Sequence, residues 1–256
     1  MLTIATWNVN GIRARQAQFA EWVERDRPDV ICLQEIKATP AQVPELVCNL
    51  AGYHCYWHGA GGYSGVALHL RKERFPSLAG APPFAHPAFD RETRVVEATV
   101  GDLVIASVYV PNGGKDYPAK LAFLADLEGY VADVHRRGAR LVLCGDLNVA
   151  RTDRDVHAKE RKAGAIGQRE DERALFEKVM AQGLVDVGRR LDPDNDNLFT
   201  WWAPWRNLRQ RNIGWRIDYV LASAPVAEAA ASCAVLSDVG TSDHAPVIAR
   251  FAIDSP

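Results

Sequence analysis

Polar side chains close or open the apolar runs of this chain at intervals along its whole length. Asn8 and Glu35 each follow an apolar run and Asp146 ends another, whereas Asp218 and Asp243 precede two more. A carboxylate at the end of a buried strand costs free energy unless a charged or hydrogen-bonding partner compensates it. We therefore expect these strand ends to meet in one polar site, with a hard divalent cation as the compensating charge and phosphoester chemistry as its use.

The composition fits one large domain with a substantial core. The chain has 256 residues, 48% of them apolar, and seven tryptophans, and a chain of this length buries roughly three-quarters of its unfolded surface. Because the polar strand ends come from both halves of the sequence, we expect a single domain over residues 1–256. The formal net charge of −2 argues against a protein that coats nucleic acid by bulk charge, so DNA contact must use local basic patches.

The cysteines and the apolar segments indicate an intracellular protein. The five cysteines are odd in number and lack a C-x-x-C pair, which favours reduced thiols. The chain begins directly in a strand-like run, without a basic or apolar leader. No stretch approaches the roughly 20 apolar residues that a membrane span needs. We therefore expect a cytoplasmic monomer that does not associate with membranes.

Apolar periodicity predicts an α/β fold with mixed sheets packed together and helices outside. A two-residue hairpin signal, the Gly-Asp pair at 101–102, indicates antiparallel pairing. Residues 76–90 and 150–169 are expected to be loops. Runs rich in Val, Ile, Leu and Tyr predict strands at 2–7, 29–34, 64–70, 94–100, 103–110, 140–146, 217–222 and 247–253. Helical spacing predicts helices at 15–26, 41–50, 118–137 and 170–182.

Asp146 and Asn148 are the strongest candidates for catalytic chemistry. In an extended segment, residues two apart point the same way, so both could face one point beyond the strand. Gly145 would let the backbone turn there without a steric penalty. A carboxylate can orient or deprotonate water, and an amide can donate to a phosphate oxygen. For this pair alone, an Asx turn that closes the strand is the alternative.

His244 differs from the other histidines because it follows an acid at the mouth of a strand. It could exchange a hydrogen bond with a phosphate, and Asp218 is a candidate to orient it. Glu35 is the best single candidate for a metal ligand, since carboxylate oxygen suits Mg²⁺ or Mn²⁺. A surface salt bridge from Glu35 to Lys37 or Arg13 is the alternative.

Seven short segments, spread over essentially the whole chain, carry these residues. They are 7–14 (WNVNGIRA), 33–37 (LQEIK), 62–67 (GYSGVA), 108–113 (VYVPNG), 145–150 (GDLNVA), 214–219 (GWRIDY) and 242–246 (SDHAP). In this order they resemble the exonuclease III family of abasic-site endonucleases, within the endonuclease/exonuclease/phosphatase superfamily. The resemblance implies a four-layer α/β sandwich, in which two mixed β-sheets pack face to face with helices on both outer faces.

The resemblance also implies a metal site and a nucleophile. Glu35 matches the principal metal ligand, with Asn10 and Asp243 near the ion. Asp146 matches the aspartate that positions or activates the attacking water, and Asp218 matches the aspartate paired with a histidine. The implied cofactor is Mg²⁺, with Mn²⁺ as a substitute. Asn10 stands where some members have aspartate, which implies one formal negative charge fewer and weaker binding of Mg²⁺.

A further set of residues resembles the family's phosphate-binding groups, namely Asn8, Asn148, Tyr109, His244 and Asn112. The implied activity is hydrolysis of the phosphodiester 5′ to an abasic site in duplex DNA, which leaves a 3′-hydroxyl and a 5′-deoxyribose phosphate. The implied second activity is 3′–5′ exonuclease action and the removal of blocked 3′ ends.

Trp201, Trp215 and Ile217 match positions that line the family's pocket for a base-free sugar. Such a slot would select by shape, and extrusion of a nucleotide is cheapest where pairing is already lost. The alternative is that these side chains belong to the ordinary core. The polar character of 200–216 favours the pocket.

Local basic side chains at the edges of the motifs are candidates for contact with DNA phosphates. Such contacts position a protein on DNA without reading its sequence. Arg13, Lys115 and Arg216 are the candidates, and Tyr63 matches a loop that approaches the duplex. The expected partner is duplex DNA with abasic sites or blocked 3′ ends.

Two alternatives remain at this stage. The same catalytic set serves phosphatases of the superfamily, so a small phosphorylated molecule could be the substrate. A catalytically inactive module that binds damaged DNA is the other alternative, and the complete catalytic set argues against it.

Overall fold

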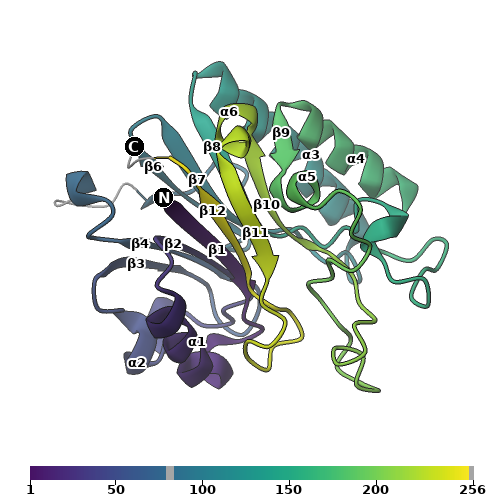
Figure 1. The fold of residues 1–256 in the computed structure, drawn as a ribbon, viewed down its shortest axis with the longest axis horizontal. Coiled ribbons are helices and arrows are strands. Elements are labelled where there is room, and N and C mark those ends of the chain that lie inside the picture. The colour runs from purple at the N-terminus through teal and green to yellow at the C-terminus, as the bar shows by residue number, and fades with distance from the viewer. Residues whose placement is uncertain (79–83, 254–256) are drawn as a thin grey trace.

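Strands that are apolar on both faces form the centre of the protein. In β2 (Val30–Gln34) and β7 (Leu103–Tyr109) every residue is buried, which requires cover on both sides of each sheet. The computed structural model describes residues 1–78 and 84–253 and provides this cover: two sheets pack face to face, with helices on both outer sides (Figure 1). The predicted four-layer α/β sandwich is confirmed.

Both sheets are mixed and have six strands. Their orders are β11-β12-β1-β2-β4-β3 and β5-β6-β7-β8-β10-β9. In each sheet one pair is parallel, β1 with β2 and β7 with β8, and the other pairs are antiparallel. The first sheet also contains β1 (Leu2–Asn8), β3 (Tyr53–His58), β4 (Val66–Arg71), β11 (Ala230–Val235) and β12 (Val247–Phe251). The second also contains β5 (Phe84–Ala85), β6 (Val95–Val100), β8 (Arg140–Asp146), β9 (Leu184–Asp186) and β10 (Asp218–Ser223).

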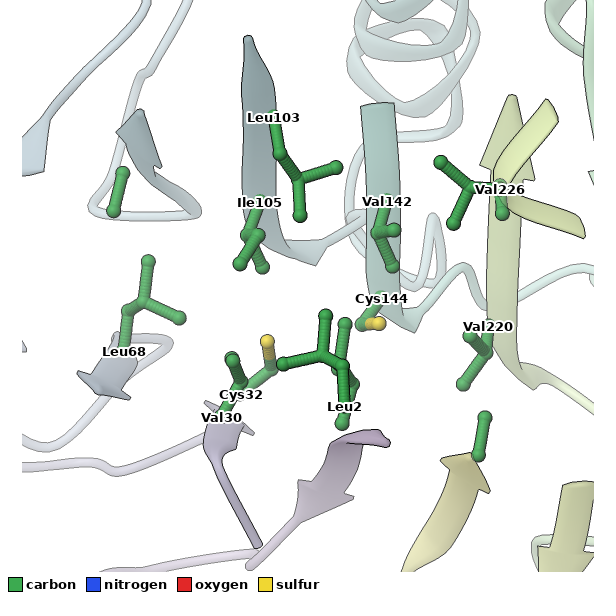
Figure 2. Packing of buried hydrophobic residues seen from close by; sticks show 14 of the residues in the cluster. Leu2, Val30, Cys32, Leu68, Leu103, Ile105, Val142, Cys144, Val220 and Val226 are labelled. Atoms are coloured by element: carbon green, nitrogen blue, oxygen red, sulfur yellow. The ribbon is translucent and has the colours of Figure 1, made fainter. Parts of the chain in front are cut away.

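The main core lies between the two sheets. Figure 2 shows Leu2, Val30 and Leu68 of one sheet facing Ile105 and Val142 of the other. Two further apolar clusters fill the outer layers, one under α1 and α2 and one under α3 and α4. The helices are α1 (Ile12–Asp26), α2 (Glu45–Cys48), α3 (Tyr117–Arg136), α4 (Glu170–Ala181), α5 (Val187–Leu191) and α6 (Ala224–Glu228). Burial on this scale is the dominant stabilising contribution to such a fold.

Each predicted strand has a counterpart, and the predicted hairpin is present, because Val100 pairs with Leu103. The predicted loop at 150–169 contains a single 3₁₀ turn, at Asp153–Asp155. The predicted loop at 76–90 contains the short strand β5, and its residues 79–83 lie outside the described residues. The strands β3, β5, β9 and β11 and the helices α5 and α6 were not predicted, because they are short or rich in polar or small residues.

The predicted helix at 41–50 is wrong in extent. The structure has a 3₁₀ turn at Pro40–Gln42 and one helical turn at Glu45–Cys48, with Pro44 as the residue before that turn. A proline disfavours helical geometry in the preceding residue and has no N–H to donate, so it breaks the continuous helix.

All five cysteines are free, as expected. Among the described residues, the helices lack the combination of length and apolar character that a membrane crossing needs.

His69 in β4 provides a test of the core. Its side chain is fully buried beside Phe19 and Trp57, and neither ring nitrogen has a hydrogen-bond partner among the described residues. Burial lowers the pKa of His69 to about 3, so the unfolded chain binds this proton more readily between that value and the usual 6.5. The buried, neutral His69 therefore costs the folded state no stability above about pH 6.5, and its contribution destabilises the fold increasingly as the pH falls from there toward 3.

We expect His69→Leu to reduce the pH dependence of stability. Between pH 6 and pH 4 the slope of the unfolding free energy should fall by up to about 1.4 kcal/mol per pH unit. Urea titrations at a series of pH values measure this slope. Above pH 7 the two stability curves should run parallel, and an unchanged slope below pH 6 would contradict the assignment.

Candidate active site

The polar strand ends of both sheets meet at one end of the sandwich. Asn8 ends β1 and pairs in register with Gln34 of the parallel strand β2, so Glu35 emerges beside it. In the other sheet, Asp146 ends β8 and lies opposite Asp218, the first residue of the antiparallel strand β10. The convergence follows from the pairing directions, because the carboxyl ends of parallel strands share an edge. The structure therefore brings the predicted residues together.

Asn8 links the two sheets within this site. Its Nδ2 donates to Glu35 Oε1 and to Asp146 Oδ2, both at 2.9 Å. Tyr109, the last residue of β7, donates its hydroxyl to Glu35 Oε1 at 2.9 Å. Asn8, Asp146 and Tyr109 are buried, so these hydrogen bonds fix the side chains in a region of low dielectric, where such contacts are strong.

Asp146 and Asn148 form a turn and also face the site. Asp146 Oδ1 accepts from the backbone N–H of Asn148 at 2.9 Å, and Asn148 Nδ2 donates to Asp146 Oδ2 at 3.2 Å. Asn112 Nδ2 in turn donates to Asn148 Oδ1 at 3.2 Å. The Asx turn weighed as an alternative is thus present alongside the predicted cluster. Asn148 is left-handed, with φ 51°, so the expected extended geometry is wrong at this residue.

Gly145 has a role other than the predicted turn. It lies within β8, where a Cβ atom would stand 1.8 Å from the carbonyl oxygen of Val108. The absence of a side chain allows the neighbouring strand to approach, which places β7 and its terminal Tyr109 beside Asp146.

His244 is held by Asp218 and faces Asp146. Its Nδ1 lies 2.9 Å from Asp218 Oδ2, and its Nε2 lies 3.9 Å from Asp146 Oδ2. Burial lowers the pKa of His244, but the carboxylates of Asp218, Asp146 and Asp243 outweigh burial and raise it to about 10. The ring is therefore protonated near neutral pH, with Nδ1 donating to Asp218 and Nε2 available as a charged donor.

The pKa of Asp146 suits a group that accepts a proton near neutral pH. Burial raises its pKa to about 7, and Asp218 and Glu35 contribute in the same direction, while His244 and Asn8 lower it. Glu35 behaves differently: burial raises its pKa, but hydrogen bonds from Asn8 and Lys37 and the charge of His244 lower it overall. Their surroundings thus give the two carboxylates different pKa values. Glu35 is ionised near neutral pH, whereas Asp146 can exchange a proton there.

The donor set fits a hard divalent cation. Ligand atoms of Glu35, Asp146 and His244 lie within 4.8 Å of one another. Because the His244 ring is protonated, its contribution is that of a donor, which leaves carboxylate oxygen as the ligand chemistry. Lys37 Nζ lies 2.7 Å from Glu35 Oε2, the salt bridge weighed above, and donates to Asn10 Oδ1 at 2.6 Å. The Glu35 carboxylate thus already binds one cationic side chain, that of Lys37.

The other two predicted metal residues lie beside Glu35 but are engaged. Asp243 Oδ1 accepts from Asn10 Nδ2 at 2.8 Å, and Asp243 Oδ2 accepts from Trp201 Nε1 at 2.9 Å. Asn10 thus connects Asp243 to Lys37 and, through Lys37, to Glu35, and Asp243 also holds the indole of Trp201.

The three predicted pocket residues form an apolar wall next to His244. Trp201 and Trp215 contact each other edge to face with ring centroids 5.6 Å apart, and Trp201 lies 6.5 Å from the His244 ring. Ile217 joins them in a cluster with Ala150 and Val156. This wall comes from the loops that extend beyond the end of the sandwich (Figure 1).

A cleft of about 620 Å³ adjoins the site on the side of Tyr109 and Asn112. Tyr63, 54% exposed, stands at its edge. Lys115 Nζ lies 5.8 Å from the centre of the Tyr63 ring. Arg13 is exposed on α1. These three predicted DNA-contact residues are on the surface, where phosphate groups can reach them.

Arg216 does not fit the prediction that it contacts DNA. Its guanidinium is buried and donates to Asp155 Oδ1 at 2.7 Å and to both carboxylate oxygens of Asp186, at 2.9 and 2.7 Å. A buried ion pair of this kind is unavailable to phosphate, and removing one partner typically costs about 3–5 kcal/mol.

Lys120 and Arg94 were missed by the sequence reasoning. Lys120 Nζ is buried, forms an ion pair with Glu172 at 2.5 Å and donates to the carbonyl of Asn148 at 2.7 Å. Its position in the buried apolar stripe of α3 was the available signal. Arg94 is also buried, donates to the hydroxyl of Tyr63 at 2.7 Å and packs against the ring of Tyr109, 4.9 Å from its centre.

The comparisons with known proteins agree with this geometry. The sequence profile of the endonuclease/exonuclease/phosphatase family matches residues 5–244. An exodeoxyribonuclease of Bacillus subtilis is 33% identical over 96% of this chain and 98% of its own length. The DNA repair nuclease APEX1 of Danio rerio is 32% identical over 98% of this chain and 83% of its own.

Solved structures give the same result. An AP endonuclease from Archaeoglobus fulgidus superposes with a TM-score of 0.88 at 30% identity, covering 99% of this chain and 100% of that one. A 3′ phosphatase from Neisseria, bound to a product DNA hairpin, has a TM-score of 0.88 at 32% identity, with the same coverage. This chain belongs to the endonuclease/exonuclease/phosphatase family, and its relatives indicate a nuclease hydrolase.

We expect Asp218→Asn to lower the pKa of His244, because it removes the negative charge nearest to the ring. Proton-detected NMR of the imidazole nitrogens, recorded in EDTA, measures the titration. The ring of the unsubstituted protein should still be charged at about pH 8, whereas that of the variant should lose its proton at lower pH. Asp194→Asn, at an exposed position, is the matched control and should leave the titration unchanged.

Proposed function

We propose that this protein is a DNA-repair hydrolase that cleaves the phosphodiester 5′ to abasic sites in duplex DNA and leaves a 3′-hydroxyl and a 5′-deoxyribose phosphate. Removal of blocked 3′ ends, with 3′–5′ exonuclease action, is its second activity. The observation that carries the proposal is the apolar wall of Trp201, Trp215 and Ile217 against His244. A wall of this kind beside a phosphate site suits a sugar that has lost its base.

Asp146 acts as the base in this proposal. Its pKa of about 7, raised by burial, allows it to orient an attacking water and accept its proton near neutral pH. Asn8, which donates to Asp146 Oδ2 and to Glu35 Oε1, holds both carboxylates in place. The water then attacks phosphorus in line with the leaving 3′-oxygen.

The phosphate is held by the surrounding donors. His244 supplies a charged N–H. The hydroxyl of Tyr109 and the amide of Asn148 now donate to Glu35 and Asp146, and each can donate to the phosphate when the phosphate replaces that carboxylate as acceptor; Asn112 is bonded to Asn148. Donors fixed before the reaction stabilise the charge that develops on the non-bridging oxygens. Asp218 acts through His244 by keeping the ring protonated and oriented.

Glu35 is the proposed metal ligand, with Asn10 and Asp243 beside it. We infer Mg²⁺ as the ion, with Mn²⁺ as a substitute, because oxygen ligands select hard cations. When bound, the cation supplies Lewis-acid stabilisation of charge on the phosphate and the leaving oxygen.

Selectivity would arise from two surfaces. The apolar wall admits a bare deoxyribose and excludes a base by shape. Tyr63, Lys115 and Arg13 would contact the DNA backbone, which gives binding that weakens with salt and reads no sequence. We further propose that the protein acts as a cytoplasmic monomer.

We expect cleavage of a 5′-labelled duplex that contains one tetrahydrofuran abasic analogue when Mg²⁺ is present, and none in EDTA. The analogue cannot undergo β-elimination, so a product with a 3′-hydroxyl identifies hydrolysis. Asp146→Asn should reduce the rate at least about 100-fold, since it removes the base, while DNA affinity is retained. Gel electrophoresis measures the rate and fluorescence anisotropy the affinity.

Each other outcome has a separate meaning. Progressive shortening from the 3′ end without an internal cut would make the protein chiefly an exonuclease. Equal cleavage in EDTA would contradict the metal site. Intact duplex together with turnover of small phosphate esters would support the alternative, a phosphatase of this family.

Gly167 offers a test of the sugar pocket. It has φ +92°, and a Cβ atom at this position would lie 2.7 Å from Trp215 Cζ3 and 3.4 Å from the carbonyl oxygen of Asn148. Gly167→Ser should therefore narrow the space in front of Trp215. We expect abasic cleavage to fall roughly 10-fold or more, while removal of a 3′-phosphate, which needs no sugar beyond the scissile bond, falls much less.

Gly164→Ser is the matched control. Gly164 is in the same loop and has a similar φ of +73°, but a Cβ atom there would meet nothing within 4 Å. The control should carry the same backbone strain and keep the ratio of the two activities. An equal loss of both activities in Gly167→Ser would contradict the pocket assignment.

A further inference from the structure

A second group of side chains that could hold a metal lies at the same end of the sandwich as the active site, but toward the edge strands, because His58 is in register with Val66, Gln34 and Asn8 across the first sheet. His58 is the last residue of β3, His86 follows β5, and Asp90 lies in the turn before β6. The strands β3 and β5 are edge strands, one of each sheet. The group therefore joins the open edges of the two sheets.

The three side chains are close enough to share one ion. Their ligand atoms lie within 4.8 Å of one another. His58 Nε2 is 2.6 Å from Asp90 Oδ2, and His86 Nδ1 is 3.8 Å from the same oxygen. The two imidazole rings stack with centroids 3.8 Å apart. His58 and His86 are 22% and 29% exposed and Asp90 is 6% exposed, so solvent ions have access.

The surroundings hold these groups in a binding arrangement. Asp90 Oδ1 accepts from the backbone N–H groups of Arg94 and Val95 at 2.7 and 3.0 Å, which leaves Oδ2 for a cation. The hydroxyl of Tyr56 lies 2.8 Å from His86 Nε2. Because Nδ1 donates to the carbonyl of Val95, Nε2 accepts from Tyr56 in this structure. When a metal binds at Nδ1 the proton moves to Nε2, and the same Tyr56 hydroxyl can accept it and so hold the orientation of the ring.

We propose that His58, His86 and Asp90 form a binding site for a divalent transition-metal ion, with zinc as the representative case. Two imidazole nitrogens and one carboxylate oxygen suit Zn²⁺, Ni²⁺ or Cu²⁺ better than Mg²⁺. The ion binds His58 through Nε2 and His86 through Nδ1, which now donates to the carbonyl of Val95 at 3.0 Å. Each ring binds as a neutral imidazole and keeps one proton on its other nitrogen, and any second proton passes to solvent.

Binding requires a small rearrangement. The in-plane lone pairs of two stacked rings do not converge on one point, so one imidazole has to rotate out of the stack. Ligand atoms around a tetrahedral zinc lie about 3.3 Å apart, so the pair at 2.6 Å has to lengthen and the pair at 3.8 Å has to shorten. His58 ends β3 and His86 follows β5, and both side chains are partly exposed, so rotation of a ring toward solvent is open to them.

A bound ion would restrict the movement of the residues at the edge of the cleft. Asp90 binds the backbone of Arg94, and Arg94 binds the hydroxyl of Tyr63, which stands at the cleft edge. An ion at Asp90 therefore fastens the turn that carries Arg94 to strand β3, from which the Tyr63 loop emerges.

Zinc binding by the full-length protein in excess Mg²⁺ tests the proposal. The Mg²⁺ occupies oxygen-rich sites, so a zinc ion that remains bound reports nitrogen ligands. Equilibrium dialysis should find one such ion per chain, and zinc should raise the melting temperature. His58→Gln and His86→Gln should lose the ion, whereas His54→Gln, on the same strand, should retain it. Tyr56→Phe should weaken binding about 10-fold.

Equal zinc binding in His86→Gln and the unsubstituted protein would overturn the proposal. X-ray absorption at the zinc edge of the unsubstituted protein gives a test that does not depend on folding of any variant. The spectrum should contain the scattering pattern of two imidazole rings. A spectrum with oxygen ligands alone would likewise overturn it.

Discussion

The active site depends on a concentration of buried negative charge. Glu35, Asp146, Asp218 and Asp243 surround one histidine, His244; Asp146 and Asp218 are buried, and Glu35 and Asp243 are partly buried. The protonated ring compensates part of this charge, and buried amides satisfy part of the hydrogen bonding. The buried negative charge that remains favours the binding of a cation, and the same burial and charge raise the pKa of Asp146. Stability and chemistry are therefore coupled at this point of the fold.

The two-sheet sandwich is what makes that concentration attainable. Just beneath the site, Gln34 of the first sheet donates to Ser107 of the second at 3.0 Å and accepts from Thr6 at 3.1 Å. Ser107 in turn donates to the carbonyl of Leu33 at 3.1 Å. These buried polar groups are fully paired, so they fix the relative position of the sheets instead of weakening the core. Asn8 then bridges the two sheets at the spacing that these hydrogen bonds set.

Much of the fold and most of the site were predictable because they rest on local patterns. Long apolar runs specify the central strands, and the polar residues at their ends predicted one cluster before any distance was known. Short edge elements such as β3 and β11 carry weaker patterns, and tertiary pairing decides them. Contacts between residues far apart in the sequence could not be predicted either. No local pattern shows that Lys120 donates to the carbonyl of Asn148, or that the close approach of Val108 leaves no room for a side chain at Gly145. Those constraints come from neighbours far away in the sequence.

Arg216 illustrates how a correct motif can give a wrong residue role. Trp215 and Ile217 both belong to the apolar wall, and in an extended segment the residue between them points to the opposite side. That side is buried against Asp155 and Asp186, so the arginine pairs with them. The ion pair holds the segment from the buried side, while its neighbours contribute to the apolar wall. A basic residue next to a pocket motif is therefore expected to contact DNA only if its place in the alternation puts it on the same face as the pocket.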